Sequence, residues 1–187
     1  MSLTNCLAAI DQLHSADPSQ TDGKANELIY AERMTVWLEK LIPNPSGELQ
    51  IAVRSQHLCR WEILRKDYPM GKAGYYKWRI RLGKLHADKA AECMLQHGYS
   101  EDFITKTKSI IRKQDYKNVP DAQTMEDCAC LVFIEFEFLG FAAKHTEEKV
   151  IDIVQKTWGK MSEKAHQAAL ALDLPKDALA LIVKALS

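Results

Sequence analysis

Apolar residues recur three and four positions apart along almost the whole chain, and sustained alternation of apolar and polar residues is scarce. The first spacing places apolar side chains on one face of an α-helix, whereas a half-buried strand needs the second. The pattern therefore predicts an all-α protein whose helices are separated by Pro- and Gly-containing turns. The expected helices cover approximately residues 4–15, 27–42, 47–61, 72–96, 101–113, 122–144, 147–161, 162–172 and 176–186.

The chain has an ordinary size for one folded core. It has 187 residues, of which 47% are hydrophobic, and no shift in composition, internal repeat or low-complexity tract marks a linker. We therefore expect a single helical domain over residues 1–187, built as a bundle of about seven to nine helices. Its most apolar segment, Cys128 to Ala143, is expected to be the central helix.

The charges of the chain balance. Lys and Arg together number 25, and Asp and Glu together also number 25, so the overall field that draws a protein onto nucleic acid or an anionic membrane is missing. The lysine-rich segment after Lys144 is interrupted by Glu147, Glu148 and Asp152, which argues against a nucleic-acid surface. A site for an anion must therefore be local.

The cysteines and the N-terminus indicate the compartment. The five cysteines form an odd set without the spacing of a zinc site or a disulfide framework, which favours a reducing environment. The N-terminal segment has no basic stretch before its apolar residues, unlike a signal peptide. The segment from Cys128 to Ala143 is shorter than the roughly 20 residues that span a bilayer. We expect a cytoplasmic protein with no membrane partner, and a second copy of the chain is a candidate partner.

The densest polar cluster is RSQHLCRWEILR, residues 54–65. Helical spacing would place Arg54, His57 and either Arg60 or Trp61 on one face. A solvated helix face explains many such runs. His57, however, lies among apolar residues, and this favours a pocket.

Other ionisable residues are candidates for the same pocket. His86 follows Arg79 by seven residues, so both lie on one side of the long predicted helix. Asp127 begins an apolar stripe, and an inward-pointing carboxylate needs a cation or a metal. Glu32 lies one step from an apolar stripe, and Lys113 ends a predicted helix.

Each of these residues also has a purely structural explanation. A histidine near an apolar face is more often hydrogen-bonded in the core than a ligand. Glu32 can pair with Arg33 or Lys40 at the surface, and Lys113 suits the negative end of a helix dipole.

The segment from Glu62 to Met70 is expected to be an ordered loop that forms one wall of the pocket. Pro69 restricts Tyr68 to extended geometry, and Tyr68 can anchor the loop against the bundle. Such a loop would fix Arg65 near Arg60. The alternative is an ordinary surface loop.

Several segments together resemble one known family. The blocks are ELIYAERMTVWLEKLIP, RSQHLCRWEILRKDYPMGKAGYYKWRIRLGKLHA, IIRKQ, TMEDCACLVFIEF and FAAKHTEEKVIDIVQKTWGKMS. They look like the domain-of-unknown-function 4202 family, whose fungal members are sometimes labelled glutamyl-tRNA synthetase. No nucleotide-binding loop on a strand-helix unit accompanies them here, so the synthetase label gains no support. Leu64 stands where the family pattern has proline.

The order of elements also resembles the HD-type metal-dependent hydrolases. This resemblance implies an HD-like bundle with Glu32, His57, His86 and Asp127 around one pocket that holds one divalent metal ion. The His-Asp doublet that defines those enzymes reads His57-Leu58 here, so one carboxylate ligand of a two-metal site is absent.

Two functions follow. In the first, one metal held by His57, His86 and Asp127 hydrolyses a phosphorylated small molecule or nucleotide, with Glu32 as a ligand or base. In the second, the chain binds an anionic metabolite or nucleotide without catalysis. The residues expected to hold the anion or stack on it are Arg54, Arg60, Trp61, Arg65, Tyr68, Tyr75, Trp78, Arg79 and Lys113.

Overall fold

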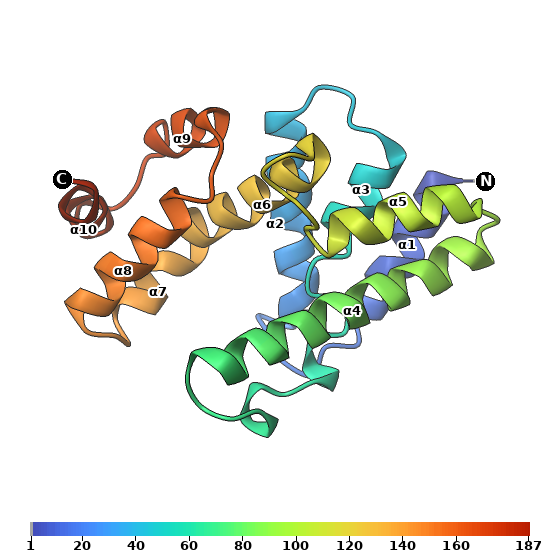
Figure 1. Ribbon diagram of the computed structural model, residues 1–187, viewed down its shortest axis with the longest axis horizontal. Coiled ribbons are helices and arrows are strands. Elements are labelled where there is room, and N and C mark those ends of the chain that lie inside the picture. The colour runs from blue at the N-terminus through green and yellow to red at the C-terminus, as the bar shows by residue number, and fades with distance from the viewer. Residues whose placement is uncertain (1) are drawn as a thin grey trace. The chain divides into compact units, whose positions relative to one another are not determined.

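In the computed structural model, which describes residues 2–187, most of the chain is helical (Figure 1). These residues form ten α-helices, and their only strands are two strands of two residues each. The prediction of an all-α fold is confirmed. The chain divides into two units, Met1–Met125 and Glu126–Ser187, and the prediction of one domain over residues 1–187 stays a prediction.

The first unit contains the N-terminal elements. They are α1 (Leu3–His14), β1 (Gln20–Thr21), β2 (Lys24–Ala25), α2 (Asn26–Leu41), α3 (Gly47–Arg54), the 3₁₀ turns η1 (Arg60–Glu62) and η2 (Arg65–Asp67), α4 (Lys72–Gln96) and α5 (Glu101–Ile111). The division of the chain falls within α6 (Pro120–Val132). The remaining elements are the π-helical turn η3 (Phe133–Glu137), α7 (Phe138–Ala142), α8 (Glu147–Trp158), α9 (Glu163–Leu170) and α10 (Lys176–Leu186).

Serine side chains cap helix starts in the first unit. The Ser46 and Ser100 side chains accept hydrogen bonds from the backbone N–H groups of Leu49 and Phe103, at the starts of α3 and α5. Such caps satisfy N–H groups that have no partner inside the helix. The first turn of each of these helices is acidic, which suits the positive end of its dipole.

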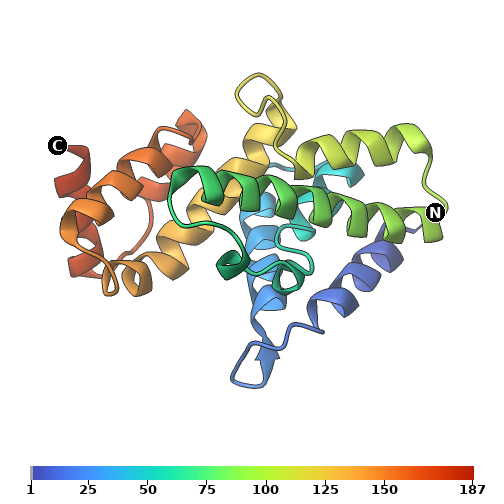
Figure 2. The same ribbon diagram turned by 60° about the horizontal axis from the view of Figure 1, so that its bottom comes forward.

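The core of the first unit lies between its long helices. α3 packs against α2 and α5, and α4 packs along α5, as Figures 1 and 2 show. Ile10, Met34, Leu38, Ile51 and Leu82 are fully buried there. This packing brings the turn that follows α3 against the middle of α4.

α3 is shorter than the sequence predicts. The expected helix 47–61 ends at Arg54, where the Ile51 carbonyl accepts from both the backbone N–H and the hydroxyl of Ser55, at 3.0 and 2.7 Å. His57 and Cys59 both have left-handed backbone angles, with φ of 65° and 57°. A helix cannot continue through such residues. The polar cluster 54–65 is therefore a folded turn and not one helix face.

The polar segment between α1 and α2 forms a small hairpin. Gln20 pairs with Ala25 and Thr21 with Lys24, and both turn residues, Asp22 and Gly23, have positive φ. This is the turn that Asp-Gly favours between two strands. The sequence indicated a turn-rich connection here, and the hairpin is the form it takes.

In the second unit, a π-helical turn divides the predicted helix 122–144 into α6 and α7. Cys128 and Leu131 before this turn are buried, but Phe136 and Leu139 are exposed. The segment from Cys128 to Ala143 is therefore not one regular helix: Phe138 in its second half is buried, but Phe136 and Leu139 beside it face solvent. The insertion of one residue into the helical turn explains the change of face.

The core of this unit comes mainly from α8 and α10. The buried residues of this core cluster are Phe138, Val150, Val154, Ala178 and Ala185. No helix within residues 2–187 combines the length and the apolar character needed to cross a membrane.

Candidate anion-binding site

A cavity of about 70 Å³ lies in the first unit, between α4, the turn after α3 and the end of α5. Arg79, Leu82, Gly83 and His86 line it from α4, and their spacing of three, four and seven residues places them on one helix face. The remaining lining residues are Gln56, Ile111, Arg112 and Lys113.

The polar lining of this cavity is mostly cationic. Arg79, Arg112 and Lys113 all contribute to its wall, and none of its described lining residues is acidic. The side chains of Arg79 and Arg112 form no ion pair with any carboxylate in the described part of the chain. Two guanidinium groups near one another without carboxylate partners create a local positive potential, which attracts an anion.

Backbone strain surrounds the cavity. Lys113 has a φ of 51° at the end of α5, and His57 and Cys59 have positive φ in the turn after α3. Residues other than glycine, asparagine, aspartate and histidine rarely adopt this conformation, so Cys59 and Lys113 are the unusual cases, at a cost on the order of 1–3 kcal/mol each. Such strain accumulates where a protein fixes functional groups.

His86 presents a hydrogen-bond acceptor at the cavity. Its Nδ1 lies 2.6 Å from the Leu58 carbonyl oxygen, and because a carbonyl only accepts, Nδ1 must carry the proton. Burial is the main cause that lowers the pKa of His86 to about 3, and Arg79 and Arg60 act in the same direction. In the neutral ring, Nε2 is therefore an unprotonated acceptor.

His57 lies beside His86, with 6.2 Å between the ring centroids, but does not line the cavity. Its Nδ1 donates to Glu27 Oε2 at 3.1 Å, and its Nε2 accepts from Arg60 Nη1 at 3.1 Å. Burial, followed by the charge of Arg60, keeps the pKa of His57 well below its ordinary value. Both ring nitrogens of His57 are therefore already hydrogen-bonded, and the ring stacks on Tyr30.

The turn after α3 is tied to α4 by its backbone. Besides the bond from His86 to Leu58, Trp78 Nε1 donates to the Ile63 carbonyl at 2.9 Å. Trp78 is buried, and the Arg60 guanidinium lies 5.2 Å from the centre of its ring. Trp78 and Arg60 thus support the wall instead of facing a ligand.

The loop from Glu62 to Met70 is held by its own contacts. Arg65 Nη1 donates to the carbonyls of Tyr68 and Pro69, at 2.9 and 3.1 Å. A Cβ at Gly74 would lie 1.9 Å from the Pro69 carbonyl oxygen, so only glycine permits this close approach of the loop to α4. Arg65 therefore closes the loop and does not line the cavity.

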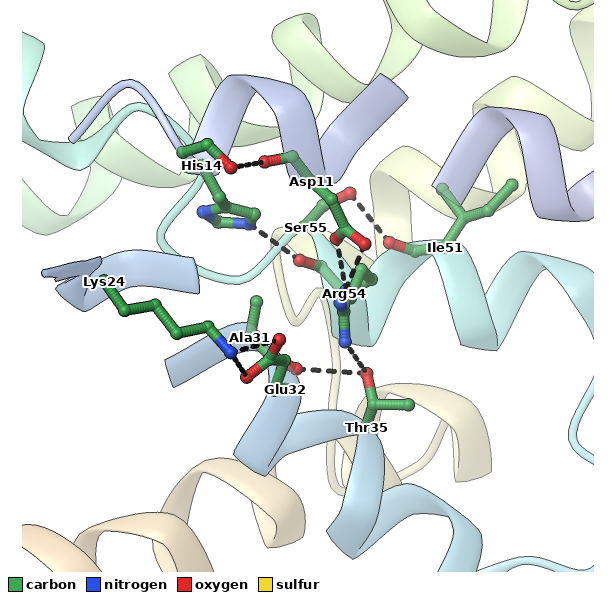
Figure 3. A network of polar contacts seen from close by, with 10 residues as sticks. Asp11, His14, Lys24, Ala31, Glu32, Thr35, Ile51, Arg54 and Ser55 are labelled. Carbon is green, nitrogen blue, oxygen red and sulfur yellow. Dashed lines mark hydrogen bonds and ion pairs between the residues drawn. The ribbon is translucent and has the colours of Figure 1, made fainter. Parts of the chain in front are cut away.

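Arg54 and Glu32 belong to separate polar contacts, which Figure 3 shows. Arg54 donates to both carboxylate oxygens of Asp11, at 2.6 and 2.8 Å, and to the Thr35 hydroxyl at 3.1 Å. Glu32 pairs with Lys24 at 2.6 Å, and about two fifths of its side chain is exposed (40%). Arg54 thereby links α1, α2 and α3.

Asp127 belongs to the second unit. Its Oδ1 accepts from the Ser162 backbone N–H at 2.8 Å, and its Oδ2 accepts from the Ser162 hydroxyl at 2.5 Å. Ser162 caps α9, so Asp127 fixes the start of that helix.

The structure therefore brings together three of the residues singled out from sequence, Arg79, His86 and Lys113. Sequence reasoning missed Gln56 and Arg112 on the wall and Glu27 behind it. Gln56 directly precedes His57, and Arg112 directly precedes Lys113. Their position next to predicted site residues is the one feature of the sequence that could have pointed to them. Within residues 2–187, no group of three or more His, Cys, Asp or Glu side chains is arranged to hold a metal ion.

Comparisons with known proteins locate the chain within a family. The family model described as Domain of unknown function (DUF4202) matches residues 4–182. No curated protein matches the chain, and no solved structure matches it. Because the matched residues cover nearly the whole sequence, the chain belongs to the DUF4202 family of domains of unknown function.

Proposed function

We propose that this chain binds a phosphate-bearing small molecule in the cavity between α4 and the end of α5. One observation carries the proposal: three cationic side chains, those of Arg79, Arg112 and Lys113, line a small cavity whose described wall contains no carboxylate. A guanidinium group without a carboxylate partner can give two parallel hydrogen bonds to phosphate oxygens. The chain as a whole is neutral, so this positive charge is a local feature.

The size of the cavity limits what it can hold. One water needs roughly 10–15 Å³ in the same measure, and the cavity offers about 70 Å³. That space suits a group of phosphoryl size, and the rest of a ligand must remain outside. The unprotonated Nε2 of His86 supplies an acceptor for a protonated phosphate oxygen or a ligand hydroxyl.

Hydrolysis of the bound ligand by one divalent metal, and an HD-like topology, stay predictions. His86 could still offer its Nε2 to a metal, but both ring nitrogens of His57 already have hydrogen-bond partners. The Asp127 carboxylate is occupied by Ser162. Elemental analysis of protein purified without chelator tests the metal directly: a stoichiometric metal that is lost in His86→Ala would favour hydrolysis over binding alone.

Thermal unfolding with inorganic phosphate tests the proposed function. A ligand that binds only the folded state stabilises it by mass action. We expect phosphate to raise the Tm of the wild type, and we expect EDTA to leave this increase unchanged. Arg79→Gln should abolish the increase, whereas Lys144→Gln, which removes an exposed charge of the second unit, should retain it. An increase that disappears with EDTA, or that survives in Arg79→Gln, would contradict the proposal.

The cytoplasmic location, the lack of a nucleic-acid partner and the association with a second copy also stay predictions. An oligonucleotide titration and the molar mass measured in solution would test the last two.

A further inference from the structure

A second basic hollow shares a wall residue with the cavity. It has a volume of about 380 Å³ and is more open to solvent than the cavity. Its lining residues are Tyr68, Lys77, Ile80, Arg81, Lys84 and Arg112. We call it the outer groove. Arg112 lines both hollows, so its one guanidinium group can contact anions in either.

α4 supplies the charges of the outer groove. Lys77, Arg81 and Lys84 follow one another at spacings of four and three residues, which aligns them along one helix face. Within residues 2–187 these three side chains form no ion pair and no hydrogen bond. The described lining of the outer groove, like that of the cavity, contains no acidic residue.

Gly83 lies where the two hollows approach each other on α4. It lines the cavity, while Ile80 and Lys84, which flank it on the helix, line the outer groove. No atom lies within 4 Å of the place where a Cβ of Gly83 would be. The surface of α4 is therefore unobstructed at this point, beside Arg112.

The outer groove also has an apolar component. Tyr68 reaches it from the loop after η2, and Ile80 is 71% exposed. A ring or carbon skeleton can pack on such side chains while its charged groups pair with the surrounding cations.

We infer that the ligand is a small organic bisphosphate: one phosphoryl group occupies the cavity, and the second occupies the outer groove, with Arg112 between them. This inference rests on the proposed function and deepens it. The cavity holds only one phosphoryl-sized group, so a second group must bind outside it, where Lys77, Arg81 and Lys84 are available. The carbon skeleton between the two groups passes Gly83 and contacts Tyr68 and Ile80.

Calorimetric titration at about 0.15 M salt, where distant charges are screened, tests the inference. The probes are inorganic phosphate, pyrophosphate, glucose 6-phosphate and glucose 1,6-bisphosphate. We expect the bisphosphate to bind the wild type at least tenfold more tightly than the monophosphate. In the double variant Arg81→Gln/Lys84→Gln this ratio should fall to about one, while the affinity for inorganic phosphate changes less than about threefold.

Lys72→Gln is the matched control, because Lys72 is an exposed cation of α4 that lines neither hollow. It should leave the ratio unchanged. If phosphate binds and needs Arg79, but the ratio is near one or persists in the double variant, the inference is wrong and the proposed function stands. The inference would also be wrong if pyrophosphate bound more tightly than inorganic phosphate while glucose 1,6-bisphosphate bound no more tightly than glucose 6-phosphate. If phosphate does not bind the wild type, the proposed function fails and the inference fails with it.

Discussion

Lys113 follows the C-cap residue of α5 in a left-handed conformation, at the position where many helices have glycine. A lysine is unfavourable there, yet the conformation places it on the cavity wall. Residues in sparsely populated conformations persist when the surrounding structure holds them, and they concentrate at functional sites. The strain at Lys113 is therefore consistent with a role in ligand binding and has a measurable consequence.

Replacing Lys113 with glycine should separate stability from binding. Glycine adopts positive φ without strain, but it also loses more conformational entropy on folding than lysine does. The two effects oppose each other, so Lys113→Gly should not lower the free energy of unfolding by more than about 1 kcal/mol. Phosphate affinity should fall about tenfold or more, because a charged hydrogen-bond donor is lost. Denaturant unfolding and calorimetry provide the two measurements.

Asn44→Gly is the control for this variant, since Asn44 also has positive φ and lies in the exposed connection between α2 and α3. It should leave phosphate affinity unchanged. If Lys113→Gly binds phosphate like the wild type, Lys113 has no part in the site.

His86 makes the stability of the protein depend on pH. Its pKa in the folded protein, about 3, lies below the ordinary 6.5, so the unfolded chain binds the proton more tightly. Stability should therefore fall as the pH decreases from about 6.5 toward about 3, by up to about 1.4 kcal/mol per pH unit for this group. His57, whose pKa is also lowered mainly by burial, adds to the effect.

Unfolding free energies measured between about pH 6.5 and about pH 4.5 test this linkage. The slope of stability against pH should be shallower in His86→Gln than in the wild type. Ala90→Gly, a substitution at a buried position of the same helix without a titrating group, should lower stability by about 1 kcal/mol at every pH and keep the slope. An unchanged slope in His86→Gln would show that His86 does not remain neutral.

Residue-level reasoning from sequence found part of the site and could not find the rest. Arg79 and His86 share a helix face, and spacing alone predicts that. The approach of Gln56 to them depends on how the chain turns after Arg54, which a local pattern does not determine. The same spacing argument placed Arg54 with His57, but Arg54 forms its ion pair with Asp11, 43 positions away in the sequence.

At the scale of elements, the helices were predictable and two of their ends were not. Serine caps and apolar periodicity predict most helix starts and faces. The end of α3 depends on the left-handed turn that follows it at His57 and Cys59, and the division of helix 122–144 depends on a π-helical turn. Neither feature changes the apolar periodicity enough to be seen in the sequence.

The loop before α4 packs closely against the start of that helix at Gly74. An alanine there would place its Cβ 1.9 Å from the Pro69 carbonyl, so Gly74→Ala should displace the loop and cost on the order of 1–3 kcal/mol. In the wild type, the contacts of Arg65 should slow trypsin cleavage at Arg65 and Lys66, and in Gly74→Ala cleavage there should become rapid.

Gly83→Ala is the comparison, because Gly83 lies in the same helix and has open space around its Cβ position. It should stabilise the helix by roughly 0.5–1 kcal/mol and leave the loop protected. Rapid cleavage in both the wild type and Gly74→Ala would show that the loop is open in both, and slow cleavage in both would show that the loop does not need Gly74 to stay closed.

At the scale of the whole molecule, acidic and basic residues are equal in number but unevenly distributed along the chain. The chain has as many acidic as basic residues, but Lys72, Lys77, Arg79, Arg81 and Lys84 follow one another in α4 without an acidic residue before Asp88. On a neutral protein, such a basic segment would attract small anions locally, and this agrees with the proposed function. Family membership adds no activity to this picture, so the site itself must be tested.

Calorimetric titration of inorganic phosphate into the wild type and Arg79→Gln tests the central claim most directly. We predict one phosphate per chain in the wild type and an affinity at least tenfold lower in Arg79→Gln, because one charge-assisted hydrogen bond contributes about 1.5–3 kcal/mol. Lys144→Gln, which removes the same charge far along the chain, should bind like the wild type. Equal phosphate affinities in all three proteins, or no heat of binding in the wild type, would contradict the claim that this cavity is an anion site.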